Sequence, residues 1–502
     1  MADAACPRRR SRRFDPPPVF YTRREVMTPQ QRNQVLSPAA GHALCRDPRP
    51  GRHRQLGPVA GAFAVVAIAG GLVSGNGRYT HLAIALLLGA FAGLALLARE
   101  TLRESEAGAG RLSASGGQSG ADAAQRTWER VLSAALLLFL ALGITTKPGE
   151  FVRGPLYRVI QVVVNLVLGG AVWAAFFRRE PRPQVCRTVF FLAVVAGFGL
   201  RLGMLQASPS PAIDVFVEFQ ESARHLLAGL NPYTAPVSDV YLGTRDYGYQ
   251  LLGYAYLPAN LYLQTAAYAL TTDFRYACIA AEAVVAAALY RVARPAAGRL
   301  VPMLVVLLFL FHPRGLFVIE QGWTEPFIGG AFALFLWLRD RGSGSPWPAA
   351  AYGYMLSLKQ YLVYFVLHLF MIERRGKALA IAAATGFLTI VPFLVWDPAS
   401  FYAYGVRFQL DTAFRPDGLT IVALLYRLVG LTAGKWLAAV VGLGVALYTY
   451  RRFLPLGLAG YLLAVTLTTF SIFLFGSQTF CNYYYLVSVI CLVVFAAHTR
   501  RA

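Results

Sequence analysis

Charge is scarce in this sequence. Asp, Glu, Lys and Arg make up 14% of its 502 residues, whereas a soluble globular chain usually carries about 25%. Nearly uncharged runs recur from residue 57 to residue 497, each roughly long enough to cross the ~30 Å hydrocarbon core of a bilayer. A buried core explains one or two such runs but not a dozen. The composition therefore predicts an all-α polytopic membrane protein, because a β-barrel would show short alternating segments instead.

Acidic residues are scarcer than basic ones. The chain has 25 Asp and Glu against 47 Lys and Arg, a net charge of +22. The basic residues gather at the N-terminus and in short loops between apolar runs, as the positive-inside rule expects, so we expect no nucleic-acid partner. Cysteine is also sparse: six residues form no CxxC pair and have no His/Cys ligand spacing, so we expect no metal site and no disulfide framework.

Residues 1–55 lack any apolar periodicity and are rich in Arg, Pro and Gln. This composition predicts a disordered basic cytoplasmic tail. The segment lacks the apolar core and small-residue cleavage site of a signal peptide. Either Met1 or Met27 fits as the true start.

The basic loops predict the topology. Placing them in the cytoplasm gives about fourteen spans, within a range of about 11–15, and a large outer loop at 207–256. Residues 56–187 then form an accessory N-terminal transmembrane region of about four helices, and 188–502 form the second region. The predicted spans lie near 57–75, 82–98, 129–145, 158–177, 188–206, 275–291, 300–316, 324–338, 347–358, 361–373, 378–395, 434–450, 456–474 and 484–497.

The outer loop opens with a charged amphipathic segment. Asp214, Glu218, Glu221 and His225 follow at i, i+4, i+7 and i+11, so they share one stripe of a helix. Apolar residues supply another face, and Gly229 or Asn231 is expected to end the helix. The pattern predicts a helix lying along the membrane surface. In the alternative interpretation, its charges only meet water.

Three cations are unusual for their predicted positions. Lys359 has no other charged residue near it between Pro346 and Glu373, and a Lys at membrane depth costs roughly 2.5–3.5 kcal/mol. It is either functional or a hairpin-tip Lys that reaches lipid headgroups. Arg407 and Arg415 lie in an outer loop, where they are either ordinary solvated charges or, with Lys359, ligands of a phosphate.

Several other polar and aromatic residues fall on the same predicted face. Outer turns carry Glu320, Gln321, Gln478 and Asn482, each of which is alternatively structural. The Tyr-rich segment 245–260 is either an interfacial anchor or a stacking surface for sugars.

Short motifs in this region resemble a known family. "GLNPY" (229–233) follows the acidic helix, a Tyr-rich segment with a Pro comes next, and "EQGW" (320–323) and "SLKQY" (357–361) occur at later outer turns. These motifs resemble the GT-C superfamily of integral membrane glycosyltransferases, and within it the polyprenyl-phosphate-mannose-dependent glycosyltransferase family 87. The resemblance covers about residues 188–497. "LPAN" (257–260), "EQGW" and "QTFCNYYY" (478–485) differ from the family's Tyr-Pro-Pro, Gly-Gln-x-Asn and His-rich final loop.

The resemblance implies a GT-C-like fold and an inverting single displacement at the outer face of the cell membrane. The sequence shows no DxD-type pair with persuasive context, although Asp239 and Asp246 lie in the outer loop, so we expect no obligatory metal and no other cofactor. The donor would be a polyprenyl-phosphate sugar, mannose in the closest group, and the acceptor a glycan or glycolipid. The implied general base is Asp214, with Glu218 and Glu221 as alternatives. The implied ligands of the donor phosphate are Lys359, Arg407 and Arg415. The implied sugar or acceptor ligands are His225, Asn231, Tyr233, Tyr256, Glu320, Gln321, Gln478 and Asn482.

Two other functional classes compete. A secondary transporter also has many spans, but transporters tend to show internal repeats and binding-site charges near the midplane. A lipid-binding or scaffold protein would need no acidic stripe beside an Asn-Pro-Tyr turn. Here the notable polar residues crowd one predicted face, which favours the transferase.

Overall fold

The computed structural model describes residues 56–108, 118–177, 182–241, 253–293, 300–341, 345–373 and 375–498. Gly51–Ala502 form one compact unit. The predicted tail at 1–55 and residues 245–252 of the Tyr-rich segment lie outside the described residues.

All regular elements of the described residues are helices, so the all-α prediction is confirmed. The first twelve α-helices are α1 (Leu56–Val73), α2 (His81–Gly108), α3 (Gln118–Thr145), α4 (Leu156–Phe176), α5 (Pro183–Ala207), α6 (Asp214–Leu227), α7 (Pro258–Thr271), α8 (Arg275–Ala293), α9 (Val301–Leu310), α10 (Gly315–Gln321), α11 (Glu325–Asp340) and α12 (Trp347–Leu356). The remaining α-helices are α13 (Tyr364–Ile372), α14 (Gly376–Trp396), α15 (Pro398–Tyr402), α16 (Phe408–Asp411), α17 (Ile421–Val429), α18 (Trp436–Phe453), α19 (Leu458–Leu474) and α20 (Cys481–His498). Four short helical turns are η3 (Ser74–Gly77), η4 (Gln360–Val363), η5 (Ala403–Arg407) and η6 (Leu454–Leu456).

Eight helices among the described residues are long and apolar enough to cross a membrane. A ninth span results if α9 and α10, which meet at a 44° bend, are counted together. Three shorter apolar stretches of 10–17 residues also occur. The chain is therefore a multi-pass membrane protein, and the count of about fourteen spans stays a prediction. The eight candidates are Ala60–Gly77, His81–Arg103, Arg126–Thr145, Leu156–Phe176, Pro183–Ala207, Arg275–Ala293, Gly376–Trp396 and Trp436–Leu456.

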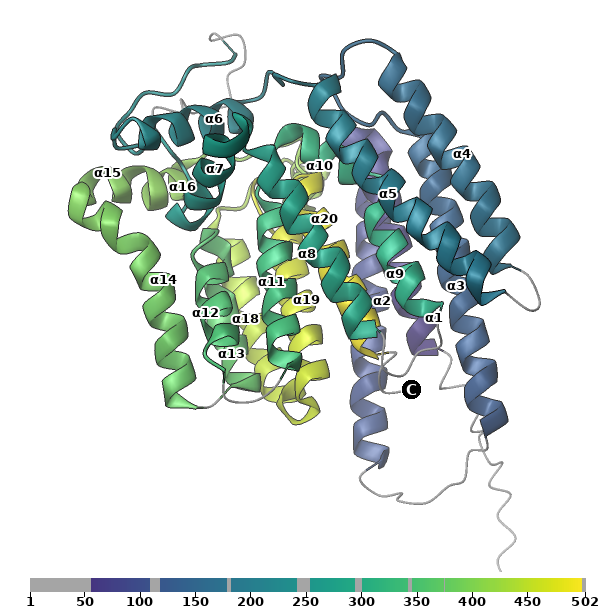
Figure 1. Ribbon diagram of the computed structural model, residues 1–502. Helices are drawn as coiled ribbons and strands as arrows, with labels where there is room; N and C mark the ends of the chain where they lie inside the picture. The colour runs from purple at the N-terminus through teal and green to yellow at the C-terminus, as the bar shows by residue number, and fades with distance from the viewer. Residues whose placement is uncertain are drawn as a thin grey trace, which may run out of the picture. The chain divides into compact units, whose positions relative to one another are not determined.

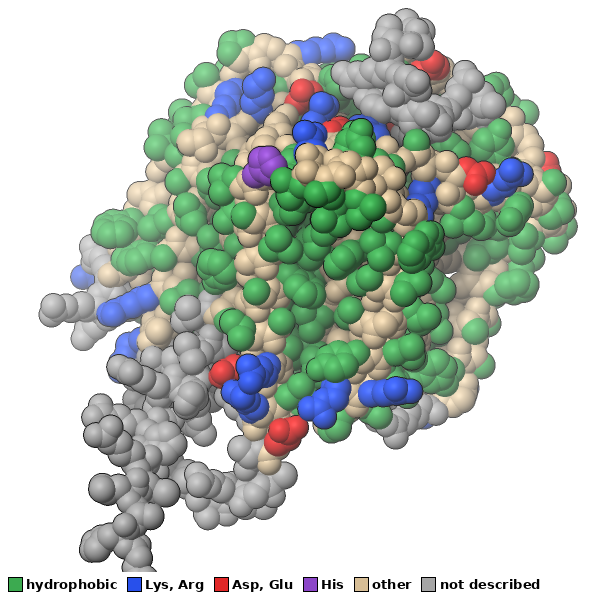
Figure 2. All heavy atoms as spheres, turned by 180° about the vertical axis from the view of Figure 1, so that it is seen from behind, with side chains coloured by type: hydrophobic (Ala, Val, Ile, Leu, Met, Phe, Trp, Pro, Cys, Tyr) green, Lys and Arg blue, Asp and Glu red, His purple; other side chains and the backbone are tan. Residues whose placement is uncertain are grey.

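The surface agrees with a bilayer environment. Figure 2 shows hydrophobic side chains across the middle of one face, with charged side chains gathered toward its two ends. Large apolar side chains on the candidate spans are widely exposed, including Val167, Phe191 and Leu388 at 65%, 66% and 67%. Exposed apolar surface on this scale is unfavourable in water but suits lipid contact.

Loops that were predicted to share the outer face lie together. They contact one another through backbone hydrogen bonds at the end of the unit that carries α6 and α7 (Figure 1). These bonds run from Tyr79 N to Asp417 O (2.9 Å), from Arg153 N to Ala207 O (2.8 Å) and from Leu419 N to Thr479 O (2.7 Å). We call this the α6 end.

Basic loops contact one another at the opposite end. Arg291 pairs with Asp340 at 3.6 Å, and Arg452 pairs with Glu106 at 3.8 Å. We call this the basic end. Which end faces outward stays a prediction from the positive-inside rule.

The N-terminal helices pack into the same unit as the rest of the chain. Helix α1 packs against α2, α3 and α20, and α3 also packs against α9. Arg314 Nε donates to Leu72 O at 3.0 Å, which joins the end of α1 to the bend between α9 and α10. The accessory role of 56–187 stays a prediction.

Candidate functional site

Helix α6 begins and ends where its sequence favours it. Asp214 is its first residue, where a carboxylate stabilises the positive end of the helix dipole. At the other end Gly229 has φ +74°, a conformation that glycine adopts without strain. Leu230 N donates to His225 O at 2.9 Å and Gly229 N to Leu226 O at 3.1 Å, the pattern of a Schellman cap. The prediction that Gly229 ends this helix is confirmed.

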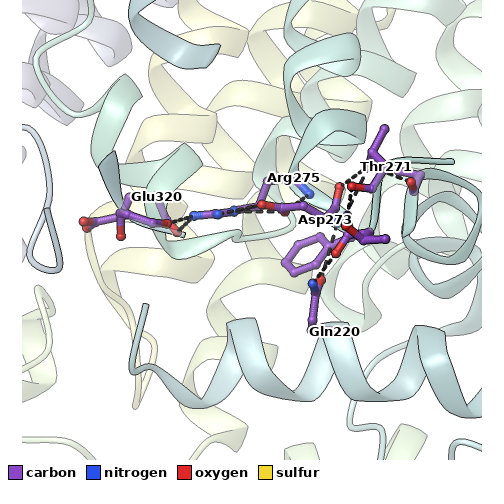
Figure 3. Close-up of polar contacts among 9 residues, drawn as sticks. Gln220, Thr271, Asp273, Arg275 and Glu320 are labelled. Atoms are coloured by element: carbon purple, nitrogen blue, oxygen red, sulfur yellow. Dashed lines mark hydrogen bonds and ion pairs between the residues drawn. The ribbon is translucent and has the colours of Figure 1, made fainter. Parts of the chain in front are cut away.

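A polar network fastens α6 to the turn between α7 and α8 (Figure 3). Gln220 Nε2 donates to Thr272 O at 2.6 Å. Beside it, the fully buried Arg275 pairs with Asp273 at 2.6 Å and donates to Glu320 O at 3.2 Å. This network fixes the position of α6, and with it that of its carboxylates, relative to α8 and α10.

The acidic stripe of α6 faces protein as well as solvent. Glu218 is 1% exposed and accepts a hydrogen bond from Ala255 N at 2.6 Å. Glu221 accepts from Ser238 N at 2.8 Å and from Ser238 Oγ at 2.6 Å, and His225 is half-buried. The alternative in which these charges only meet water is therefore wrong for Glu218 and Glu221.

Glu218 and Asp214, the first two carboxyls of the stripe, differ in burial. Burial raises the pKa of the Glu218 carboxyl well above its ordinary value; the Ala255 hydrogen bond opposes this rise and the nearby Asp214 adds to it. Asp214 is half-buried, and its Oδ1 accepts from Val215 N at 2.9 Å and from Tyr241 Oη at 3.3 Å. Asp214 is thus the more accessible of the two carboxyls and the better candidate for the base.

Lys359 is buried in a cage of aromatic rings. It follows α12 in extended conformation and is 6% exposed. Its Nζ pairs with Glu325 Oε1 at 2.7 Å. The rings of Tyr256, Tyr361 and Tyr483 surround Nζ, with centroids 5.5, 5.5 and 4.5 Å away. We call Glu325, Lys359 and these three tyrosines the lysine cage. A Lys reaching lipid headgroups would be exposed, so that alternative does not describe Lys359.

Tyr256 connects the lysine cage to α6. Its ring packs 4.9 Å from that of Phe219. Burial raises the pKa of the Tyr256 phenol well above its ordinary value, and the charges of Glu218, Asp214 and Glu325 add to the rise. One phenol therefore lies within electrostatic reach of both the α6 carboxylates and the Lys359–Glu325 pair.

Two of the residues predicted to bind sugar or acceptor hold the backbone that carries Tyr256. Tyr233 is fully buried, and its Oη donates to Tyr256 O at 2.7 Å. Asn231 Oδ1 accepts from Tyr233 N at 3.0 Å, which stabilises the turn after α6. Both residues thus stabilise the backbone that positions Tyr256.

Arg407 and Arg415 are already paired. Arg407, whose side chain is 68% exposed, pairs with Asp411 at 3.0 Å. Arg415 pairs with Asp417 at 2.8 Å. Burial alone would raise the pKa of the Asp417 carboxyl, but the hydrogen bonds and charge of Arg415 lower it overall.

The loop carrying Arg407 runs beside the site. Gln360 Nε2, next to Lys359, donates to Gly405 O at 2.7 Å. Gln409 Nε2 donates to Ala255 O, also at 2.7 Å. The structure therefore brings this loop to both Lys359 and Tyr256, while the Arg407 guanidinium points to its own i+4 carboxylate.

Four further predicted ligands bond to, or are buried within, the loops. Glu320 accepts from Phe151 N at 2.8 Å and from Gln321 Nε2 at 2.8 Å. Gln478 Nε2 donates to Ala413 O, and Asn482 is buried at the start of α20. Glu320 and Gln478 thus join loops of the α6 end to one another.

The sequence interpretation missed Glu325, Tyr361 and Tyr483. Glu325 was the available signal, because it is an acidic residue at the start of an otherwise apolar run. Its Oε2 is buried and has no hydrogen-bond partner in the described part of the chain. No group of three or more His, Cys, Asp or Glu among the described residues is arranged to hold a metal ion.

Comparison of the chain with models of protein families, with curated proteins and with solved structures finds no match. The residues of the site are therefore the basis for a functional assignment.

Proposed function

We propose that this protein is an integral membrane glycosyltransferase that moves a sugar, mannose on the family resemblance, from a polyprenyl-phosphate donor to a hydroxyl of a glycan or glycolipid at the outer membrane face. The observation that carries the proposal is the position of Tyr256, whose ring lies 5.5 Å from Lys359 Nζ and 4.9 Å from the ring of Phe219 on α6, next to Ala255, whose N–H donates to Glu218. The acidic helix and the buried cation thus both contact the segment around Tyr256, where a lipid-linked substrate would present its head.

The proposed chemistry is a single displacement. Asp214 accepts the proton of the acceptor hydroxyl as its oxygen attacks the anomeric carbon. The bond from that carbon to the phosphate oxygen breaks, and the bonding electrons leave with the lipid phosphate. Inversion follows from one in-line attack, so no enzyme nucleophile is required.

Lys359 stabilises the departing phosphate. Negative charge grows on the phosphate during the reaction, and a cation in a partly dehydrated site stabilises such charge strongly. Glu325 holds Nζ in place in the resting protein. The phenol rings of the cage offer flat faces to the sugar.

The decisive test is Asp214→Asn in membranes supplied with a radiolabelled polyprenyl-phosphate sugar. We expect transfer to fall by about 10²–10⁴-fold, the usual contribution of a general base. Glu150→Gln is the matched control, since Glu150 is an exposed carboxylate at the same end. Unchanged transfer in Asp214→Asn would remove Asp214 as the base, and no transfer by the wild-type protein from any such donor would overturn the proposal.

A second candidate function is secondary transport. It is favoured by a buried ion pair between Arg201 of α5 and Glu282 of α8. Tyr485 Oη donates to Glu282 at 2.5 Å, and Arg201 Nη1 donates to Leu310 O, at the bend after α9, at 2.9 Å. Buried charges beside a broken helix are features of transporters. Loss of solute flux into vesicles in Glu282→Gln, with sugar transfer absent from the wild type, would favour this function.

A further inference from the structure

The basic end holds a cavity that the proposed function does not use. It has a volume of about 390 Å³ and lies where α11, α12, α13 and α14 end or begin, away from α6 and α7 (Figure 1). Its lining is of two kinds. Apolar side chains include Phe335, Ala349 and Leu369, and charged side chains are Arg339, Arg375 and Glu373.

The charged side of the cavity carries an excess of cations. Arg375 pairs with Glu373 through Nη2 at 2.7 Å and Nε at 2.9 Å, so these two charges offset each other. Arg339 Nη1 donates to Ile372 O at 3.1 Å. A guanidinium has five N–H donors, so this bond leaves donors for another acceptor. Two guanidinium groups against one carboxylate give the lining one net positive charge.

The apolar side of the cavity indicates what kind of molecule would bind there. A soluble anion would gain nothing from Phe335 and Leu369, whereas an amphiphile places a charged head and an apolar chain in the same cavity. The depth of the cavity in the membrane also suits an amphiphile. Trp347 is 66% exposed beside the lining residue Pro348, and Trp is enriched at the membrane interface.

We propose that this cavity binds an anionic phospholipid, with its phosphate on Arg339 and Arg375 and the start of an acyl chain against Phe335 and Leu369. Guanidinium groups bind phosphate oxygens through paired, charge-assisted hydrogen bonds. The site is independent of the proposed transferase reaction, because it lies at the basic end and shares no residue with the lysine cage.

Native mass spectrometry of the full chain in detergent tests the proposal. Phosphatidylglycerol and phosphatidylcholine are titrated separately, and we expect a preference for the anionic lipid that falls roughly tenfold in the double variant Arg339→Gln/Arg375→Gln, as expected for lost charge-assisted bonds. Arg452→Gln is the control, an exposed Arg that pairs with Glu106 outside the cavity; it should keep the preference.

A second variant covers the case in which the double variant does not fold. Ala349→Phe keeps both arginines and fills the cavity from α12, so it should lose the same bound lipid. Retention of the lipid by Ala349→Phe, or an equal loss in Arg452→Gln, would overturn the proposal. Displacement of the lipid by inorganic phosphate at matched concentration would overturn the lipid assignment.

Discussion

Lys359 and Glu325 form a buried ion pair whose two members depend on each other. Lys359 is 6% and Glu325 1% exposed. Lys359→Met would leave the Glu325 carboxylate buried without a counterion, so we expect the free energy of unfolding to fall by about 3–5 kcal/mol. The double variant Lys359→Met/Glu325→Gln should lose clearly less, because it removes both charges. Thermal unfolding of the purified protein in detergent measures both, and an equal loss in the two variants would contradict the pairing.

Glu218 gives a prediction about pH. Its pKa is raised from 4.5 by burial, so the fold favours the protonated form. The stabilisation is complete below the unfolded pKa and is lost as pH rises through the folded pKa. Glu218→Gln mimics the neutral carboxyl and should flatten the dependence of the melting temperature on pH over that window.

The Ala255 hydrogen bond supplies the control for Glu218. Gln keeps an oxygen that accepts from Ala255 N, whereas Glu218→Ala leaves that N–H unpaired and should cost about 1–3 kcal/mol. If Glu218→Gln and Glu218→Ala are equally destabilised, the Ala255 hydrogen bond does not contribute to stability.

At the scale of single residues, the sequence predicted candidates for the site but not which residues pair with them. Lys359 was identifiable because it is isolated in an apolar run. Its partner Glu325 and the ring of Tyr483 lie far from it in the chain, and their approach depends on how α11, α12 and α20 pack. No spacing rule reports such contacts. The ion pair of Arg415 was easier to predict from the sequence, since its partner Asp417 is only two residues away.

Helix α6 was predictable as an element from its periodicity and its terminal glycine. The sequence did not predict which way the acidic stripe of α6 faces. Glu218 of the stripe is buried like its apolar neighbour Phe219, so polarity alone does not separate the buried face from the exposed one. Residues 231–241 and 253–257 and the α7–α8 turn contact the helix, and these tertiary contacts decide which polar positions lose water.

The anchoring of α6 through Arg275 leads to a prediction for this element. Arg275 bonds to Asp273, Ser208 O and Glu320 O, and its guanidinium lies 4.7 Å from the ring centroid of Phe216. Arg275→Met should loosen these contacts together and raise amide hydrogen exchange across α6. Arg224→Met is the control, because Arg224 is an exposed residue of the same helix. Unchanged exchange in Arg275→Met would mean that other contacts hold α6.

For the molecule as a whole, the two ends should face opposite sides of the membrane. The four described cysteines are buried, so a variant with Cys6 and Cys45 replaced by Ser should react weakly with an impermeant thiol reagent. In that background Ser210→Cys, at the α6 end, should be labelled from outside intact cells. Lys377→Cys, at the basic end, should be labelled only after permeabilisation. Labelling of both from one side would contradict the topology.

Charge asymmetry and hydropathy predicted which loops lie together at one end of the molecule. The loops placed on one face by basic-residue counting contact one another in the structure. The number of spans is harder to derive, since α13, α19 and α20 are short and α9 bends into α10. Length and hydropathy do not distinguish a short span from a helix that is buried within the protein.

The contact between α1 and α20 bears on how the protein is made. Helix α1 is translated long before α20, which is one of its packing partners. Until α20 is made, α1 must therefore be retained by earlier partners such as α2, α3 and the α9–α10 bend, with part of its surface covered by lipid or by the insertion machinery. A chain that stops before α20 would leave that surface exposed for good, and we expect cellular quality control to degrade such truncated products while it spares the full-length protein.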